Sequence, residues 1–226
     1  MNAKTNPFLL ALLCLLFAGL VSGCNDDDDL PQGPTYLAKS KIVISEIAGM
    51  PTDMTFDKIK VEIQGTCWEI ISSVEAPYEH GEVTLELPTG FSSDKLQLVD
   101  RSGGDMCGYW PGTSSDPDAL VASLGDFIAY DGDVKVGRVY LTDWPGEGSA
   151  ASKSFIYYQY ADRPFELTYL AKSTTSFKDA VFKKGWNAFA KVNPSDNDSE
   201  TVSNITCTTA ISGDTQTHWR FESWRY

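Results

Sequence analysis

The chain has 226 residues, of which 42% are hydrophobic and 12% aromatic, and its 18 Lys and Arg against 31 Asp and Glu give a net charge of −13. This acidity argues against nucleic acid as a partner and against binding to an anionic membrane through a basic patch. The only histidines are His80 and His218, and neither lies in a recognisable motif, which argues against a nucleophilic cysteine paired with histidine.

The N-terminal segment has the composition of an export signal. Lys4 precedes an apolar run from Phe8 to Leu20, which is too short and wrongly flanked for a spanning helix. Val21-Ser22-Gly23-Cys24 follows this run. The segment resembles a bacterial lipoprotein signal with its lipobox, which implies cleavage before Cys24 and diacylglycerol on the Cys24 sulfur. The alternative is ordinary secretion with a free Cys24.

Four consecutive aspartates come directly after the lipobox: Asp26, Asp27, Asp28 and Asp29. They have two interpretations, a solvated, self-repelling tether or a signal for export to the cell surface. The run resembles the surface-export signal of Bacteroidota lipoproteins, and we favour this interpretation. Two or three acyl chains on Cys24 would anchor the protein stably to membrane lipid, which a single chain does not. Together with the acidic run, the resemblance implies a protein in the outer membrane that is exposed at the cell surface.

We therefore expect three parts: a signal peptide at 1–23, a lipidated acidic tether at 24–36 and an all-β domain at 37–226. Cleavage removes one Lys and no acidic residue, so the mature chain has 17 basic and 31 acidic residues and a net charge of −14. An internal domain boundary has its best place in the Gly-, Ser- and Asp-rich stretch at 100–125. Of the remaining cysteines, Cys67, Cys107 and Cys207, at most two can pair, and the sequence does not select the pair.

Short runs with alternating polar and apolar residues fill the rest of the chain. Strands are predicted at Phe56–Ile63, Glu82–Leu87, Lys95–Val99, Asp126–Tyr130, Val134–Leu141, Phe155–Tyr160, Phe165–Leu170, Trp186–Val192 and His218–Trp224. One helix is predicted at Asp116–Leu124, with Asp116 as N-cap and Pro117 at the first helical position. The fold class that follows is an all-β, antiparallel β-sandwich, with a β-barrel or two small β domains in tandem as alternatives.

Three segments in the last hundred residues resemble a loose group of Bacteroidota cell-surface lipoproteins of unassigned function. They are the aromatic strand Phe155–Tyr160 followed by Asp162, the turn Lys184-Gly185-Trp186-Asn187, and the closing strand Trp219–Trp224. The Lys-Gly-Trp-Asn segment predicts a hairpin in which Gly185 takes a positive φ and Trp186 begins the returning strand. The resemblance implies a fold and a location, and it implies no substrate or catalytic residue.

Aromatic residues outside strands are the best candidates for a binding site. Tyr109 and Trp110 lie in the long loop, and Trp144 lies beside Pro145 and Gly146. Tyr157 and Tyr158 must point to opposite faces of their strand, so one of them can face solvent. Of the four tryptophans in or beside strands, at least half should be core residues: Trp68, Trp186, Trp219 and Trp224. The competing explanation for all these rings is a large aromatic core.

Metal and cofactor chemistry has weaker signals. The loop with Asp196, Asp198 and Glu200 is rich in oxygen-bearing side chains that could bind calcium, as is Asp131-Gly132-Asp133. Neither segment has the residue order of an EF-hand, and hydrated turns more often have this composition. No phosphate loop, histidine cluster or Ser/His/Asp signature is present, so we expect no cofactor.

These observations favour a non-enzymatic cell-surface lipoprotein that binds an extracellular ligand, with a glycan as the preferred class. The first alternative is a structural or adhesin-type component that contacts another envelope protein. The second is a glycoside hydrolase, which would need two carboxylates that face each other across a sugar.

Overall fold

The computed structural model describes residues 40–99, 112–144, 153–169, 175–178, 180–193, 205–209, 211 and 216–224. These residues all belong to the second of two compact units, 33–226. The fold is all-β with antiparallel sheets packed together as a sandwich, which confirms the predicted fold class. The candidate residues Cys24, Asp26–Asp29, Tyr109, Trp110, Asp196, Asp198 and Glu200 lie outside the described residues, so their assigned roles stay predictions.

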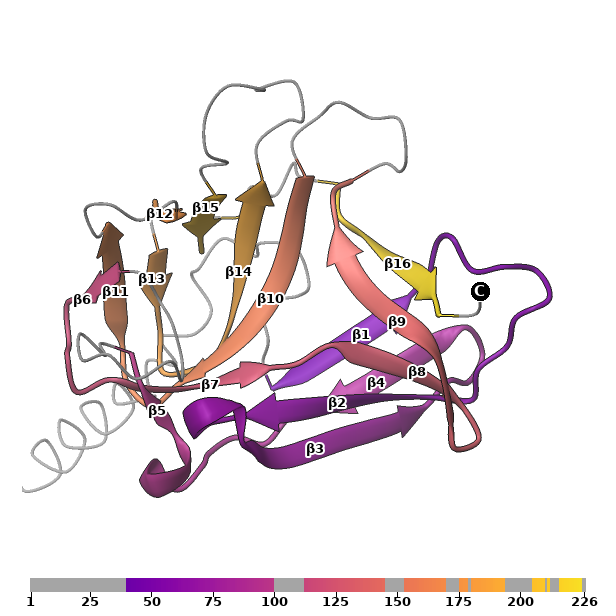
Figure 1. The fold of residues 1–226 in the computed structure, drawn as a ribbon, viewed down its shortest axis with the longest axis horizontal. Helices are drawn as coiled ribbons and strands as arrows, with labels where there is room; N and C mark the ends of the chain where they lie inside the picture. Colours follow the sequence, from indigo (N-terminus) through magenta and orange to yellow (C-terminus); the bar gives the residue numbers. More distant parts are fainter. Residues whose placement is uncertain are drawn as a thin grey trace, which may run out of the picture. The chain divides into compact units, whose positions relative to one another are not determined.

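The main sheet is a strongly twisted array that runs through the whole unit (Figure 1). In the order in which neighbours pair, its strands are β12 (Thr175–Phe177), β15 (Ile205–Thr208), β14 (Gly185–Asn193), β10 (Lys153–Ala161), β7 (Leu120–Leu124), β2 (Lys58–Gln64), β8 (Phe127–Asp131), β9 (Val134–Thr142) and β16 (His218–Ser223). Two strands join it from the side, β3 (Ile70–Pro77) on β2 and β5 (Gln97–Leu98) on β7. Only the β12–β15 pair is parallel among the strand pairs of the described residues.

Two smaller sheets complete the fold. One consists of β1 (Lys41–Ser45) and β4 (Glu82–Glu86), and the other of β13 (Ala180–Phe182), β11 (Phe165–Tyr169) and β6 (Gly112–Ser114). Short 3₁₀ turns, η1 (Thr66–Trp68) and η2 (Ser93–Lys95), lie between strands.

The main core lies between the β1–β4 pair and one face of the main sheet. Alternation along β1 and β4 buries every second residue, and β2 buries its own apolar set against them. The fully buried aliphatic residues of this layer are Ile42, Ile44, Ile59, Val61, Ile63, Val83 and Leu85. A second cluster lies under the three-stranded sheet, where Phe165 and Phe182 stack with ring centroids 4.7 Å apart.

The predicted helix at Asp116–Leu124 is wrong. Residues 115–118 form a turn, and Leu120–Leu124 is strand β7, paired with β10 and β2. Asp116 does act as a local cap, because its Oδ1 accepts a hydrogen bond of 3.0 Å from Asp118 N, but that bond closes a turn and not a helix. Val121 and Leu124 bury in the two different cores, so both faces of a central strand are covered.

The predicted hairpin at Lys184-Gly185 is also wrong, although Gly185 has the expected positive φ of 98°. β13 pairs with β11 and β14 pairs with β10, so the chain crosses from one sheet to another at this turn. The Asn187 side chain holds the turn: its Oδ1 accepts from Lys183 N at 2.8 Å, and its Nδ2 donates to Lys183 O at 2.7 Å and to Gly185 O at 2.9 Å. The motif is therefore a structural crossing.

Candidate functional site

The face of the main sheet opposite the main core carries a row of rings. Tyr158 on β10 is buried in the core at 1% exposure, whereas its neighbour Tyr157 is 40% exposed on the other side, as the alternation predicts. Tyr157 stacks on Phe189 of β14 with centroids 5.6 Å apart, and Phe155 lies 5.7 Å from Tyr140 of β9. We call this surface the aromatic face, made of Tyr130, Tyr140, Trp144, Phe155 and Tyr157, whereas Phe189 is itself buried in the second core cluster.

Trp144 is the one loop aromatic among the predicted site residues that the structure describes. It follows β9 and is half-buried, with its backbone N donating to Thr142 Oγ1 at 3.0 Å. Two cations lie against its ring, Lys153 Nζ at 4.9 Å and Arg220 Cζ at 5.2 Å from the centroid. Arg220 Nη1 also donates to Trp144 O at 3.3 Å. Trp144 is therefore fixed at one end of the aromatic face.

A groove opens beside Tyr157 because β10 changes partner there. Its residues Phe155 and Ile156 pair with β9, and Gln159–Ala161 pair with β7, so Tyr157 and Tyr158 have sheet partners only in β14. The Gly125-Asp126 turn follows β7 at this point, and the narrow groove is lined by Asp126, Tyr140 and Tyr157 together with core residues. Aromatic rings thus flank a carboxylate in a slot about one water molecule wide, with a volume of about 30 Å³.

A second, wider groove continues from the same turn. It shares Gly125 and Asp126 with the first and has a volume of about 160 Å³. Its remaining walls are Lys60, Glu62, Gln64, Ile128, Tyr130 and Lys135. Enclosed sites for drug-sized ligands usually have about 300 Å³ or more. This groove is therefore better suited to a ligand that lies across the surface of the sheet than to one that is fully enclosed.

Burial and the neighbouring charges both act on the hydroxyl group of Tyr157. Partial burial raises the pKa of its hydroxyl, Asp126 raises it further, and Arg138 opposes the change. Arg138 is half-buried, and burial works against its charge, but the Glu222 carboxylate at 2.6 Å and Asp126 at 4.0 Å together raise its pKa. The groove therefore offers a phenol hydroxyl and a carboxylate, both of which can form hydrogen bonds with the hydroxyl groups of a ligand.

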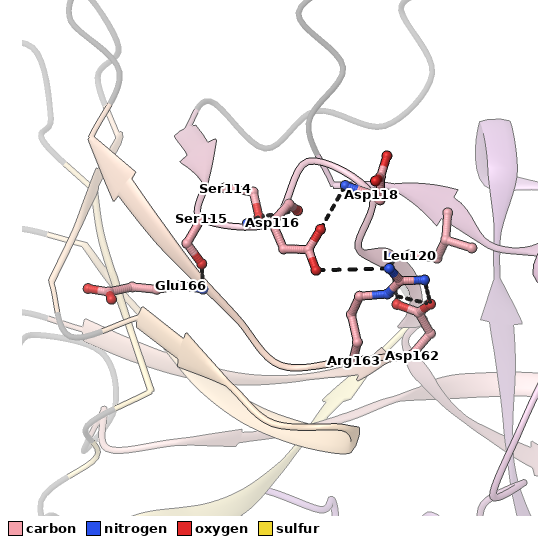
Figure 2. A network of polar contacts seen from close by, with 8 residues as sticks. All are labelled: Ser114, Ser115, Asp116, Asp118, Leu120, Asp162, Arg163 and Glu166. Carbon is pink, nitrogen blue, oxygen red and sulfur yellow. Dashed lines mark hydrogen bonds and ion pairs between the residues drawn. The ribbon is translucent and has the colours of Figure 1, made fainter.

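A separate polar network joins the turn before β7 to the turn after β10 (Figure 2). Asp162 accepts from Leu120 N at 2.8 Å and from Arg163, whose Nη2 lies 3.0 Å from Asp162 Oδ2, and Arg163 reaches Asp116 at 3.9 Å. Ser115 Oγ accepts from Glu166 N at 2.9 Å and ties in β11. Its donors and acceptors are turned toward one another, so we assign this network to the fold and not to a ligand.

The structure also gives positions for the predicted calcium-like turn, two of the cysteines and the strand tryptophans. Asp131-Gly132-Asp133 is the tight turn between β8 and β9, where Gly132 N donates to Asp57 Oδ2 at 3.0 Å. Within the described ranges, no three His, Cys, Asp or Glu side chains gather as metal ligands would. Cys67 is an exposed free thiol and Cys207 a buried one, so these two do not pair. Trp186 and Trp219 are buried and Trp68 and Trp224 exposed, which confirms that half of the four are core.

The sequence pointed to Tyr157 but missed Tyr130, Tyr140 and Asp126. Tyr130 and Tyr140 lie in regular alternating runs, which predict that they share the solvent side of β8 and β9. Their meeting with Tyr157 depends on strand order, which alternation does not encode.

Comparison with protein-family models, curated proteins and solved structures finds no match for this chain. In the part of the chain that the structure describes, no helix has the length and apolar character needed to cross a membrane.

Proposed function

We propose that this chain is a non-enzymatic lipoprotein, anchored through Cys24 at the outer face of the outer membrane, that binds an extracellular carbohydrate on its aromatic face. The lipobox and the acidic run Asp26–Asp29 support the location. The observation that carries the ligand class is the exposed Tyr157 ring beside Tyr140 and Asp126 at the groove where β10 leaves β9.

The physical reason is the two-sided character of a sugar ring. Its C–H face is apolar and packs on an aromatic ring, whereas its hydroxyls need hydrogen-bond partners at the rim. Tyr157 and Tyr140 offer the rings, and Asp126 and the Tyr157 hydroxyl offer the polar partners. The open, shallow shape suits one stretch of a longer glycan.

Glycan-array and affinity-gel measurements on the full chain in non-ionic detergent test the proposal. We expect at least one glycan to be retained, with Tyr157→Ala and Tyr140→Ala each weakening retention tenfold or more. Trp68→Ala is the matched control, because Trp68 is 58% exposed but lies outside the aromatic face, in η1. No retention of any glycan, or equal loss in all three variants, would reject the proposal, and release of reducing sugar would favour the hydrolase alternative.

A second candidate function, assembly with another envelope protein, rests on strand β3. This strand pairs only with β2 among the described residues, and its eight residues leave one backbone edge open. Open edges accept strands from partner chains. Stable co-purification of a partner that is lost in Ser73→Pro, with glycan binding absent, would favour this candidate over a glycan-binding protein.

A further inference from the structure

We infer that the carbohydrate bound on the aromatic face is an acidic polysaccharide, one with a carboxylate on its sugar rings, whose charged groups lie at Lys60 and Lys135 in the wider groove. This inference rests on the proposed function and specifies its ligand class.

The first observation is the segregation of charge. The whole chain has 31 acidic and 18 basic residues, so an average surface patch should be acidic. The aromatic face and its grooves reverse this ratio. Their cations are Lys58, Lys60, Lys135, Arg138, Lys153 and Arg220, against the carboxylates Glu62, Glu75, Asp126 and Glu222.

The second observation is that the cations and rings are interleaved. Lys58 Nζ lies 5.9 Å from the Tyr130 centroid, and Arg138 Cζ lies 5.9 Å from the Tyr140 centroid. Lys153 and Arg220 flank Trp144. A ligand that places a sugar ring on this face therefore meets positive charge beside Tyr130, Tyr140 and Trp144, and an anionic substituent on that ring gains where a neutral one does not.

The third observation concerns which cations are already neutralised. Arg138 is paired with Glu222 and Asp126. Lys60 and Lys135 line the wider groove and form no ion pair with any described residue. The carboxylates nearest these two lysines are Glu62 and Asp126 in the groove and Glu75, which faces Lys60 on β3, and none of them forms an ion pair with either lysine. The lining itself is charge-balanced, with two lysines and two carboxylates, but both ammonium groups are available to pair with a ligand carboxylate.

The density of charge selects a polysaccharide over a nucleic acid. Duplex DNA carries one negative charge per about 1.7 Å, and such a polymer would be repelled by a protein of net charge −13 with only a small cationic excess on one face. A polyuronate carries at most one charge per sugar ring. It also has the ring faces that Tyr140 and Tyr157 can stack against.

Affinity-gel measurements on the full chain in non-ionic detergent test the inference with a matched pair of polymers, polygalacturonate and its fully methyl-esterified form. We expect at least tenfold tighter retention by the acid than by the ester, and weaker retention at 300 mM than at 50 mM NaCl. Lys60→Gln with Lys135→Gln should lose five- to tenfold affinity for the acid, as expected for two exposed ion pairs, and leave the ester unchanged. Lys183→Gln with Lys184→Gln is the charge-matched control at an exposed turn.

The outcomes separate the inference from the proposed function. Equal retention of acid and ester, or retention only of neutral glycans, would overturn the inference and leave carbohydrate binding standing. Equal retention of a DNA fragment and the acid polymer would also overturn it, because charge alone would then explain binding. Retention of no glycan of either kind would reject the proposed function itself.

Discussion

Tyr157 and Tyr158 are adjacent in β10 and have opposite environments, with 40% of Tyr157 exposed on the aromatic face and Tyr158 1% exposed in the main core. The cause is the two-residue period of a strand between a packed layer and solvent. The same pair therefore separates binding from stability more cleanly than any two distant residues.

Truncation of these two tyrosines should have opposite effects. Tyr158→Ala removes a ring packed near Phe127, with centroids 6.1 Å apart, and should lower the free energy of unfolding by about 3–5 kcal/mol. Tyr157→Ala should cost about 1 kcal/mol, through its stacking on Phe189, yet weaken glycan retention tenfold or more. Urea denaturation and affinity gels on both variants measure this. A Tyr157→Ala protein that binds normally would contradict the site.

The network around Asp162 should stabilise the fold through its backbone contact more than through its ion pair. Asp162→Ala leaves Leu120 N without an acceptor and should cost about 1–3 kcal/mol. Asp162→Asn keeps an acceptor oxygen and loses only an exposed pair with Arg163, so it should cost under about 1 kcal/mol. Asp118→Ala, in the same turn but exposed, is the control for denaturant unfolding. If Asp162→Ala and Asp162→Asn lowered the free energy of unfolding equally, the ion pair with Arg163 and not the backbone hydrogen bond would be the main contribution of Asp162.

The all-β class and most strands were predictable because alternation is local. Lys58–Gln64 and Glu82–Glu86 follow directly from residues with period two. The errors come from tertiary context. Leu120–Leu124 is apolar on both sides because two cores cover it. The sequence pattern of such a short apolar run is equally compatible with a helix and a strand. The Gly185 turn has hairpin residues, but β14 finds β10 as its partner across a long separation.

The site was predictable only in part, for the same reason. Tyr157 was identifiable from its place beside Tyr158. The groove was not, because it exists where β10 passes from β9 to β7 and where Asp126 lines the opening. Those three strands are brought together by long-range pairing, which residue periodicity does not record.

Gly65 should tolerate no side chain. A Cβ at this position would lie 1.9 Å from the backbone oxygen of Lys95 and 2.9 Å from Ile71 Cγ2, so β2 and the η2 segment would have to separate. Gly65→Ala should therefore cost about 3 kcal/mol or more and disturb the Thr66 hydroxyl bond to Leu96 O, now 2.9 Å. Gly90→Ala is the control, since its nearest neighbour would be 4.0 Å away, and its midpoint in thermal unfolding should be unchanged. A small loss at Gly65 would mean that the two segments separate easily.

Cys207 should make the fold less stable in alkali. Burial raises its pKa to about 11, with Lys191 opposing the change, whereas an ordinary thiol ionises near 9.0. Between these values the unfolded chain has lost the thiol proton and the folded chain keeps it, so the free energy of unfolding falls as pH rises. At about 1.4 kcal/mol per unit the loss reaches roughly 3 kcal/mol above pH 11, and this contribution is fully present below pH 9.

Denaturant unfolding of the Cys207→Ala variant beside the parent isolates this contribution, because lysines and tyrosines titrate alike in both. The difference between the two proteins should be constant below pH 9 and should shrink between pH 9 and 11. Thiol labelling gives a second measurement in a Cys107→Ser background: exposed Cys67 should react in the native state, and buried Cys207 only when the protein opens. Rapid native labelling of Cys207, or a pH-independent difference, would show that the strand β15 edge is open to solvent and that its thiol has an ordinary pKa.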